Sequence, residues 1–352
     1  MFDVKKLFSD VFHPEPGERL VVLVDTPHDR IEDNDLWVER RNMAAEWQSV
    51  LGDYGREAGF EVAPLFQFPA VGTHNGDLPL GECQLAEVLG NATIALALTE
   101  FSPTAPMIAW AKSHDDFRVA TLPGVARRTE ETALSADYSE VARRCVILRD
   151  LLAHAESADV IFTSGHKWHV DLRHHKALMD DGQLPRGKAD PVINLPSGES
   201  FQVPYEGERA GDPSQTAGEV PVRVGEELIV YRIEANRIID VIGGPEANKS
   251  RAYFQHDASR SNVAEFAFGC NPGAVVWGNV LEDEKAGFHW AYGRSEHLGG
   301  SVGPSDFNRP ETIVHVDIVY ASESPIQVGS AVLNREDGDS VEVIRDGDYV
   351  VF

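Results

Sequence analysis

Short apolar runs alternate with amphipathic stretches in the first part of the chain. Runs of aliphatic and β-branched residues are typical of buried strands, and apolar positions three or four residues apart are typical of helices. Strands separated by helices usually pair in parallel through right-handed crossovers. This pattern predicts an open α/β sandwich with a mainly parallel sheet. The predicted strands are 19–25, 60–62, 93–98, 117–122 and 159–163, and the predicted helices are 2–12, 34–59, 105–112 and 135–155.

The second half of the chain consists mainly of strand and turn patterns. A chain of 352 residues is too long for one ordinary core, so we expect two domains. Residues 1–157 form the predicted α/β domain, which is Rossmann-like but has no G-x-G-x-x-G dinucleotide motif after a strand. Residues 158–352 form the predicted β-rich α+β domain. Its strands are expected at 218–232, 237–242, 263–269, 274–280, 287–293 and 312–320, with turns at 234–236, 336–339 and 346–348.

The stretch NLPSGE, Asn194 to Glu199, separates the two patterns. Proline and glycine stiffen and bend the backbone ahead of Glu199, which suits a carboxylate that must point in one direction. A plain surface turn is the alternative interpretation of this stretch.

Composition narrows the classes of partner and compartment. The formal net charge of −26 would repel phosphate backbones and anionic lipid surfaces, so we expect neither nucleic acid nor membrane partners. No apolar run approaches the roughly 20 residues that span a bilayer, and no secretory signal follows Met1. The three cysteines fit no zinc or disulfide pattern, which favours a reducing, cytoplasmic location. They are Cys83, Cys145 and Cys270.

Three later stretches concentrate side chains that bind metals. Glu265 lies among apolar residues in AEFAFG, and a buried carboxylate needs a partner or a cation. A dense run of acids precedes His289 in EDEKAGFH. In the predicted strand VHVD, His315 and Asp317 are two residues apart and so point to the same face. A histidine and a carboxylate on one face suit zinc, manganese, cobalt or iron, although a hydrogen-bonded surface pair is the alternative.

Four segments occur in an order that resembles the signature stretches of the aminopeptidase T family of metalloaminopeptidases, often called leucyl aminopeptidases. The segments are NLPSGESFQVP, AEFAFGCNP, EDEKAGFHWAYG and HVD. This resemblance implies two divalent metal ions (zinc, cobalt, manganese or magnesium), bridged by carboxylates, and a homodimer. It implies Glu284 as a further ligand or as the general base. The implied metal ligands are Glu199, Glu265, His289, His315 and Asp317.

The substrate side of the site departs from the family pattern. The family commonly has a tyrosine seven residues after the histidine of the third segment, and this chain has Glu296 there. Four histidines also occur within ten residues at 166–175. We predict that His166, His169 and Glu296 contact substrate. A basic, solvated loop is the alternative interpretation of the histidine-rich stretch.

The resemblance implies a metal-dependent hydrolase, and most simply an aminopeptidase that cleaves N-terminal amino acids with a water activated by two metals. The substrate would be a peptide or another small molecule. Certain ring-cleaving dioxygenases that act on dihydroxypyridines resemble the same family and hold one Fe(II) with two histidines and one carboxylate. In those relatives a histidine replaces the acid at Glu265 and the acid at Glu199 is missing, so both glutamates favour the hydrolase. A non-enzymatic metal-binding protein is a third hypothesis.

Overall fold

The computed structural model describes residues 2–81, 83–322 and 324–352, and it divides into two compact units. Unit 1 comprises Met1–Ala142, Asp180–Ser197 and Pro272–Ala274. Unit 2 comprises Arg143–Met179, Gly198–Asn271 and Val275–Phe352. The second passage from unit 1 to unit 2 therefore lies inside the NLPSGE stretch. The division into functional domains at residue 157 stays a prediction.

The described elements have the following bounds. The helices are α1 Val4–Phe12, α2 Asp35–Ala58, α3 Leu85–Asn91, α4 Thr104–Ala111, α5 Arg127–Glu131, α6 Tyr138–Ala153, α7 Pro245–His256 and α8 Val280–Asp283. The first strands are β1 Arg19–Thr26, β2 Glu61–Val62, β3 Phe66–Pro69, β4 Ile94–Ala97, β5 Arg118–Thr121, β6 Ser157–Phe162, β7 Lys167–Asp171, β8 Leu178–Asp180, β9 Val192–Asn194 and β10 Glu199–Gln202. The remaining strands are β11 Ala217–Val224, β12 Glu227–Glu234, β13 Arg237–Ile242, β14 Val263–Gly269, β15 Phe288–Gly293, β16 His315–Tyr320, β17 Val328–Asn334, β18 Ser340–Arg345 and β19 Asp348–Tyr349.

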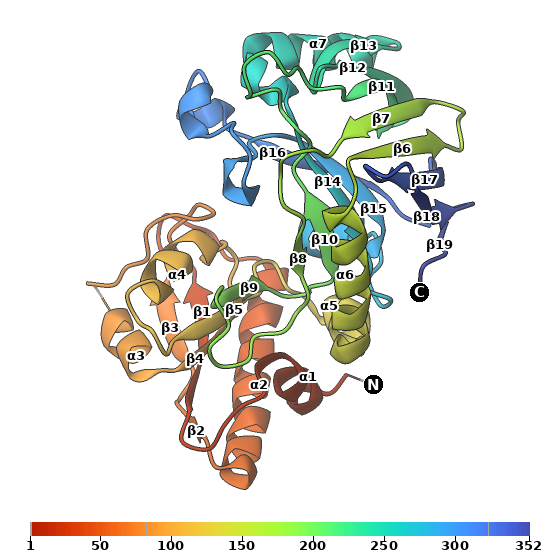
Figure 1. Ribbon diagram of the computed structural model, residues 1–352. Coiled ribbons are helices and arrows are strands. Elements are labelled where there is room, and N and C mark those ends of the chain that lie inside the picture. The colour runs from red at the N-terminus through yellow and green to blue at the C-terminus, as the bar shows by residue number, and fades with distance from the viewer. Residues whose placement is uncertain (1, 82, 323) are drawn as a thin grey trace. The chain divides into compact units, whose positions relative to one another are not determined.

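Unit 1 is built on a parallel sheet, which confirms the predicted α/β class (Figure 1). Its strand order is β2-β1-β4-β5-β9, and β3 also pairs with β1. Parallel pairing was wrongly predicted for the strand near 159–163. That strand, β6, pairs antiparallel with β7 and β17, because a tight turn with Gly165 at φ 87° leads directly into β7. The edge of the parallel sheet is β9, which is three residues long and gives little periodic signal.

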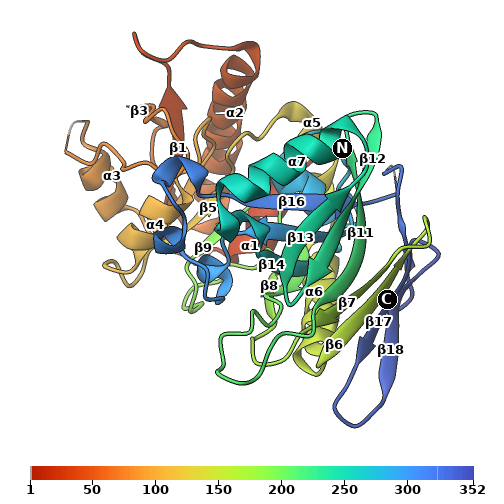
Figure 2. The same cartoon turned by 90° about the horizontal axis from the view of Figure 1, so that it is seen from above.

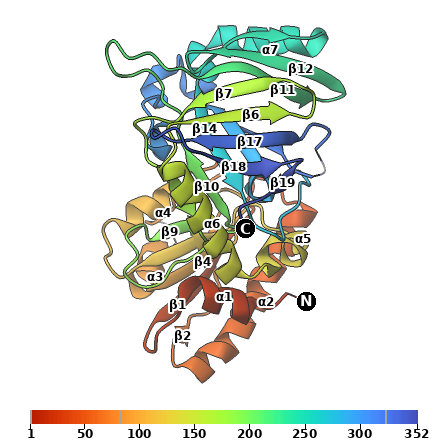
Figure 3. The ribbon, with the colours of Figure 1, turned by 45° about the vertical axis from the view of Figure 1, so that its right-hand side comes forward.

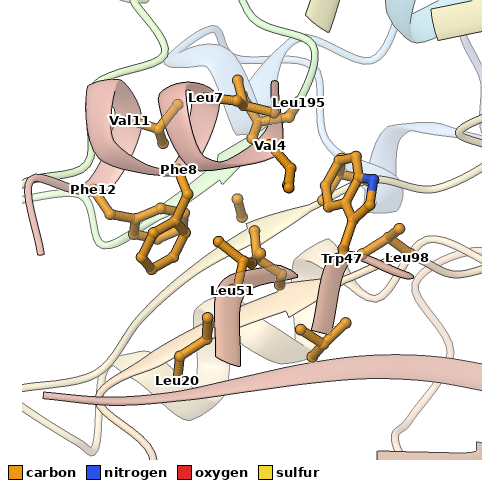
Figure 4. Packing of buried hydrophobic residues seen from close by; sticks show 14 of the residues in the cluster. Val4, Leu7, Phe8, Val11, Phe12, Leu20, Trp47, Leu51, Leu98 and Leu195 are labelled. Atoms are coloured by element: carbon orange, nitrogen blue, oxygen red, sulfur yellow. The ribbon is translucent and has the colours of Figure 1, made fainter. Parts of the chain in front are cut away.

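Strand β1 explains how the parallel sheet is covered on both faces. Leu20, Val22 and Val24 pack in one hydrophobic cluster with residues of α1 and α2. Val21 and Leu23 belong to a second cluster with residues of α3 and α4. A strand buried on both faces must be apolar at every position, which is why RLVVLVD shows no alternation. Figure 4 shows the first cluster, with α1 packed close to residues of β1 and α2.

The ends of α2 follow from its capping residues. The Asn34 side chain accepts a hydrogen bond from the Trp37 amide at 2.8 Å, which confirms the predicted N-cap. Gly59 ends the helix in the left-handed conformation at φ 85°, where a glycine avoids the strain of a Cβ. No described helix in the chain has the length and apolar character needed to cross a membrane.

Unit 2 contains two antiparallel sheets, as the predicted β-rich class requires. One has the order β16-β15-β14-β10-β8. The other has the order β13-β12-β11-β7-β6-β17-β18-β19, and its strands lie side by side in Figure 3. Helix α7 lies against β12 and β13 (Figure 2).

Two strand predictions in unit 2 need correction. The run predicted as one strand at 218–232 is the hairpin β11–β12, which turns at Gly225 with φ 57°. The run at 274–280 is a loop instead of a strand. The amide of Trp277 donates to Asp283 Oδ1 at 2.8 Å, and the amide of Val275 donates to Glu282 Oε1 at 3.2 Å. These amides bind local carboxylates rather than a neighbouring strand. The predicted turn between β12 and β13 is confirmed, with positive φ at Ala235 and Asn236.

Candidate metal centre

Four neighbouring strands of unit 2 carry the five predicted ligands on one face of their sheet, called the site face below. Residues that lie directly opposite each other in paired strands share a face. Glu265 lies opposite Ala291, which in turn lies opposite Asp317. The other site-face members follow from the same register and the two-residue repeat of a strand. They are Glu199 of β10, Ala267 and Gly269 of β14, His289 and Gly293 of β15, and His315 of β16.

The opposite face of the same strands is aromatic. Phe266, Phe268, Phe288 and Trp290 are fully buried, and their rings pack against one another or against Trp168. Large rings pack on one face of the sheet, whereas alanine and glycine lie beside the ligands on the other. A register shift between Val263 and Glu265 marks a bulge, a device that re-aims a side chain. The alternation of ring and short residue in AEFAFG therefore places Glu265 on the site face.

The predicted ligands form two groups that have one carboxylate in common. Glu199, Glu265 and His289 offer ligand atoms within 4.8 Å of one another. Glu265, His315 and Asp317 do the same. The expected shared face of His315 and Asp317 is thus observed, with 3.5 Å between Nε2 and Oδ1. Glu265 is the residue through which two cations in these groups would be connected.

Both histidines present the same nitrogen to the carboxylates. Nδ1 of His315 lies 2.7 Å from the carbonyl oxygen of Arg294, and Nε2 lies 3.0 Å from Glu265 Oε2. For His289, Nδ1 lies 3.3 Å from the carbonyl oxygen of Gly287, and Nε2 lies 3.3 Å from Glu199 Oε2. A carbonyl accepts only, so each Nδ1 holds a proton, and Nε2 is the ring atom directed at carboxylate oxygens. This tautomer is the usual one for metal-bound histidines.

Two buried atoms at the first group make no hydrogen bond within the described chain. They are Oε2 of Glu199 and Nε2 of His289. Their 3.3 Å separation is short enough for an ion pair, but the atoms are not aligned as a hydrogen bond. Buried polar atoms normally have partners, and a divalent cation between these two would supply one. The donor set therefore fits a metal ion.

The electrostatics of the site also favour a cation. Burial alone would lower the pKa of His289, but the close contact with the negatively charged Glu199 carboxylate, together with the charges of Glu265 and Asp317, outweighs it and raises the pKa to about 9. Burial likewise opposes a rise for His315, yet Asp317 and Glu265 hold its pKa well above the usual range. The same concentration of negative charge that retains a proton on these rings would attract a divalent ion. Metal binding would displace those protons.

Sequence reasoning did not single out Lys285, which is fully buried beside the ligands. Its Nζ donates to Glu199 Oε1 at 2.6 Å and to Glu284 Oε1 at 2.5 Å. Burial raises the pKa of Glu284, and although Lys285 opposes that rise, the charge of Glu199 adds to it. A carboxyl group with a raised pKa can both accept and return a proton near neutrality. The adjacency of Glu284 and Lys285 in DEK was the only sequence signal for this pair.

Gly269 allows the Glu284–Lys285 backbone to approach β14. A Cβ at this position would overlap the carbonyl oxygen of Glu284 and lie 2.7 Å from the carbonyl carbon of Lys285. The glycine at the end of AEFAFG therefore has a steric role, and it sets the depth at which Glu284 and Lys285 lie.

The three predicted substrate-binding residues are in neither ligand group. His166 lies in the β6–β7 turn and is within 2.9 Å of Ser164 Oγ. His169 in β7 pairs with Asp159 at 2.8 Å. Glu296 is exposed, lies close to the site in sequence, and pairs with Arg294 at 2.6 Å. Substrate contact by these residues stays a prediction. The neighbouring His297 has the clearest link to the site, because its ring centroid lies 4.9 Å from that of His315.

A third group, His175, Glu206 and Glu208, also has ligand-type atoms within 4.8 Å. It differs from the site because its central acid is already supplied with donors. Glu206 accepts hydrogen bonds from Asn262 at 2.6 Å and from the hydroxyl of Ser295 at 2.5 Å. These bonds account for Glu206 as an organiser of surrounding loops, with no cation required.

Comparison with known proteins identifies a fold but not a sequence family. No protein-family model matches the chain, and no curated protein matches it. Among solved structures, 2,5-dihydroxypyridine dioxygenase from Pseudomonas putida KT2440 is similar with a TM-score of 0.62 and 18% identity, covering 99% of this chain and 97% of that one. Wild-type AmpT (aminopeptidase T) from Thermus thermophilus is similar with a TM-score of 0.62 and 15% identity, covering 99% of this chain and 98% of that one. The chain shares its fold with both enzymes. At these identities, the similarity shows the fold alone.

Proposed function

We propose that this chain is a metal-dependent hydrolase, and most simply an aminopeptidase that uses two divalent cations at the site face. Glu265 belongs to both ligand groups, and this shared carboxylate is the observation that supports a pair of neighbouring cations most directly. Each group then contributes one histidine and one further acid: His289 with Glu199, and His315 with Asp317. Zinc, cobalt, manganese and magnesium are the candidate ions, because nitrogen and oxygen ligand sets overlap in their preferences.

In this hydrolase, the residues around the ligand groups would have distinct roles. Two divalent cations held by these ligands would lower the pKa of a water molecule and polarise a carbonyl oxygen. Glu284 lies beside the ligand groups without belonging to either, so its carboxylate can accept a proton from water and return it to the leaving amine. The backbone carbonyls of Arg294 and Gly287 hold the two histidines in the tautomer that leaves Nε2 free.

A mononuclear Fe(II) dioxygenase that acts on a dihydroxypyridine-like aromatic is the second candidate. The solved structure of the dihydroxypyridine dioxygenase matches this chain with the same TM-score as the AmpT structure. His289, His315 and Asp317 would provide two histidines and one carboxylate. This alternative leaves Glu199 and Glu265 buried in the site without the ligand role that would offset their burial, which favours the hydrolase.

Metal content per chain separates the two functions. The protein should be purified with air excluded and without chelator or added metal, and then analysed for all transition metals. About two zinc, cobalt or manganese ions per chain would support the hydrolase, and release of amino acids from an aminoacyl-amide panel would follow. One iron per chain, together with oxygen consumption when a dihydroxypyridine is added, would favour the dioxygenase over the hydrolase. Bound metal without turnover on either panel would favour a binding protein.

A further inference from the structure

Lys285 is an unusual component of a site that must attract cations. Its side chain is buried to 1% exposure and lies among carboxylates that would otherwise face a metal. A buried lysine normally has charged partners, and two carboxylates beside the ligands lie against this ammonium group, Glu199 at 2.6 Å and Glu284 at 2.5 Å.

Because of the contact with Lys285, the two carboxylate oxygens of Glu199 have different surroundings. Oε1 accepts from Lys285, whereas Oε2 faces Nε2 of His289 and makes no hydrogen bond in the described chain. Oε2 is therefore the oxygen of Glu199 that has no hydrogen-bond partner in the described chain and is open to a cation, whereas Oε1 already accepts from an ammonium group. A carboxylate that binds through one oxygen leaves a coordination position that two-oxygen binding would fill.

The contact with Glu284 has a parallel effect. Glu284 lies next in sequence to Lys285, and its Oε1 accepts a hydrogen bond from the ammonium group. It is absent from both ligand groups of the described chain. A carboxylate released from this contact would be an additional oxygen ligand within reach of a highly charged ion, and it would no longer be available to carry a proton.

We infer that Lys285 is a positioning residue that restricts Glu199 to one-oxygen ligation and holds Glu284 outside the coordination sphere as the base. This inference rests on the proposed binding of metal at the two groups. This positioning role predicts an effect of mutation that a lysine with only a packing role would not produce. Removal of the ammonium group should strengthen metal binding, because negative charge and ligand oxygens are gained, and should still impair hydrolysis.

The test uses Co²⁺ as the probe, titrated into the full-length chain after metal removal, with binding followed by calorimetry and by visible absorption. Lys285→Met keeps the length and apolar stem of the side chain without its charge. We expect Co²⁺ to bind about tenfold more tightly, as added carboxylate ligation does at other sites. The absorption of bound Co²⁺ should weaken, because intensity falls as coordination number rises. Lys285→Arg should retain the wild-type affinity and spectrum.

Glu284→Gln provides a second, near-isosteric measurement that does not depend on the folding of Lys285→Met. Held outside the coordination sphere, Glu284 can be neutralised without a change in Co²⁺ affinity or spectrum, while amide hydrolysis is lost. In the Lys285→Met/Glu284→Gln double variant, the part of the tightening that comes from Glu284 should disappear. Far-UV circular dichroism and thermal midpoints check that each variant is folded.

Two results would overturn the role of Lys285. Weaker Co²⁺ binding by folded Lys285→Met would mean that the lysine only supports the site. A loss of Co²⁺ affinity together with a changed Co²⁺ absorption spectrum in Glu284→Gln would mean that Glu284 is itself a ligand. The proposed dinuclear hydrolase fails on a different observation, namely one Co²⁺ per wild-type chain, and the comparison of variants still tests Lys285 in that case.

Discussion

His315 Nε2 lies 3.0 Å from Glu265 Oε2, while His315 Nδ1 lies 2.7 Å from the carbonyl oxygen of Arg294. The ring is therefore held at one end by the backbone and directed at the other toward the carboxylate shared by both ligand groups. The Nε2 atom of His315 and the carboxylate oxygen of Glu265 both carry lone pairs, which repel each other unless a proton or a cation lies between them. At this position the two alternatives compete, so a metal would replace protons as the pH rises.

Glu265→Gln should remove both ions, because Glu265 is the common member of the two groups. The amide keeps the shape of the side chain and loses its charge, so bound metal should fall from about two ions to less than one per chain. Hydrolysis should fall by at least about 100-fold, which is the size of effect seen when a group that orients a catalytic metal is lost. Elemental analysis and amide hydrolysis measure the two effects.

Glu208→Gln is the matched control for that change. Glu208 lies with His175 and Glu206 in the third group, where its Oε1 is 3.2 Å from His175 Nε2. The same chemical substitution there should leave metal content and hydrolysis unchanged. Metal loss from Glu208→Gln, or two retained ions in folded Glu265→Gln, would contradict the assignment of the bridge to Glu265.

Local patterns predicted much of the fold because each depends on neighbours in the sequence, whereas the ligand set followed from the resemblance of four segments to a family and stays a prediction. The apolar run of β1, the Asn34 cap and the two-residue spacing of His315 and Asp317 all express the geometry of single elements. Strand β9 was missed because three residues carry no periodicity. Lys285 was missed because its partner Glu199 is 86 residues away, and only the folded register of β10 and β14 brings them together.

Metal binding should stabilise the folded chain. An unfolded chain cannot assemble ligands from four strands, so an ion that binds only the folded form adds about 2.7 kcal/mol at a concentration 100 times its Kd. The thermal midpoint should therefore rise by several degrees when Zn²⁺ or Co²⁺ is added to metal-depleted protein, and a chelator should reverse the rise. Differential scanning calorimetry measures it. The Asp317→Asn variant should respond less than the wild type, and an equal response would place the stabilising metal elsewhere.

Gly269→Ala should damage the site through the backbone. The new methyl group overlaps the Glu284 carbonyl, so the segment that carries Glu284 and Lys285 must move away from β14. We expect a loss of about 1–3 kcal/mol in the free energy of unfolding, which is typical of overpacking. Hydrolysis should fall further than that loss of stability explains, because Glu284 moves relative to the ligands. Urea unfolding and amide hydrolysis measure the two effects.

Gly278→Ala is the control for a glycine in the same part of unit 2. No atom lies within 4 Å of the Cβ that it would add, although its φ of 95° adds backbone strain. A similar stability loss with normal hydrolysis per folded chain is therefore expected there. Normal hydrolysis in Gly269→Ala as well would show that the approach of the two segments is not needed for activity.

The buried pair of Glu18 and Arg118 in unit 1 should make stability depend on acid pH. Both terminal nitrogens of the guanidinium group contact the carboxylate, Nη1 at Oε1 and Nη2 at Oε2 (2.9 Å), and both side chains are nearly inaccessible. Burial alone would raise the pKa of Glu18, but the hydrogen bonds from Arg118 and the Glu15 amide outweigh it, so the pKa lies below its usual 4.5. A carboxyl whose folded pKa is depressed contributes stability above its unfolded pKa. That contribution is lost as the pH falls from about 4.5 through the lowered value.

Glu18→Gln should therefore lower the free energy of unfolding at pH 7 by about 3–5 kcal/mol, because it leaves the Arg118 charge buried and unpaired. The difference from wild type should shrink below pH 4.5, the usual pKa of the group. Glu18→Gln/Arg118→Met removes the charge of both partners and should recover most of the loss at pH 7. Urea unfolding at several pH values measures all three proteins. A difference between wild type and Glu18→Gln that stays constant down to pH 3 would show that shape, and not the carboxylate charge, determines the effect.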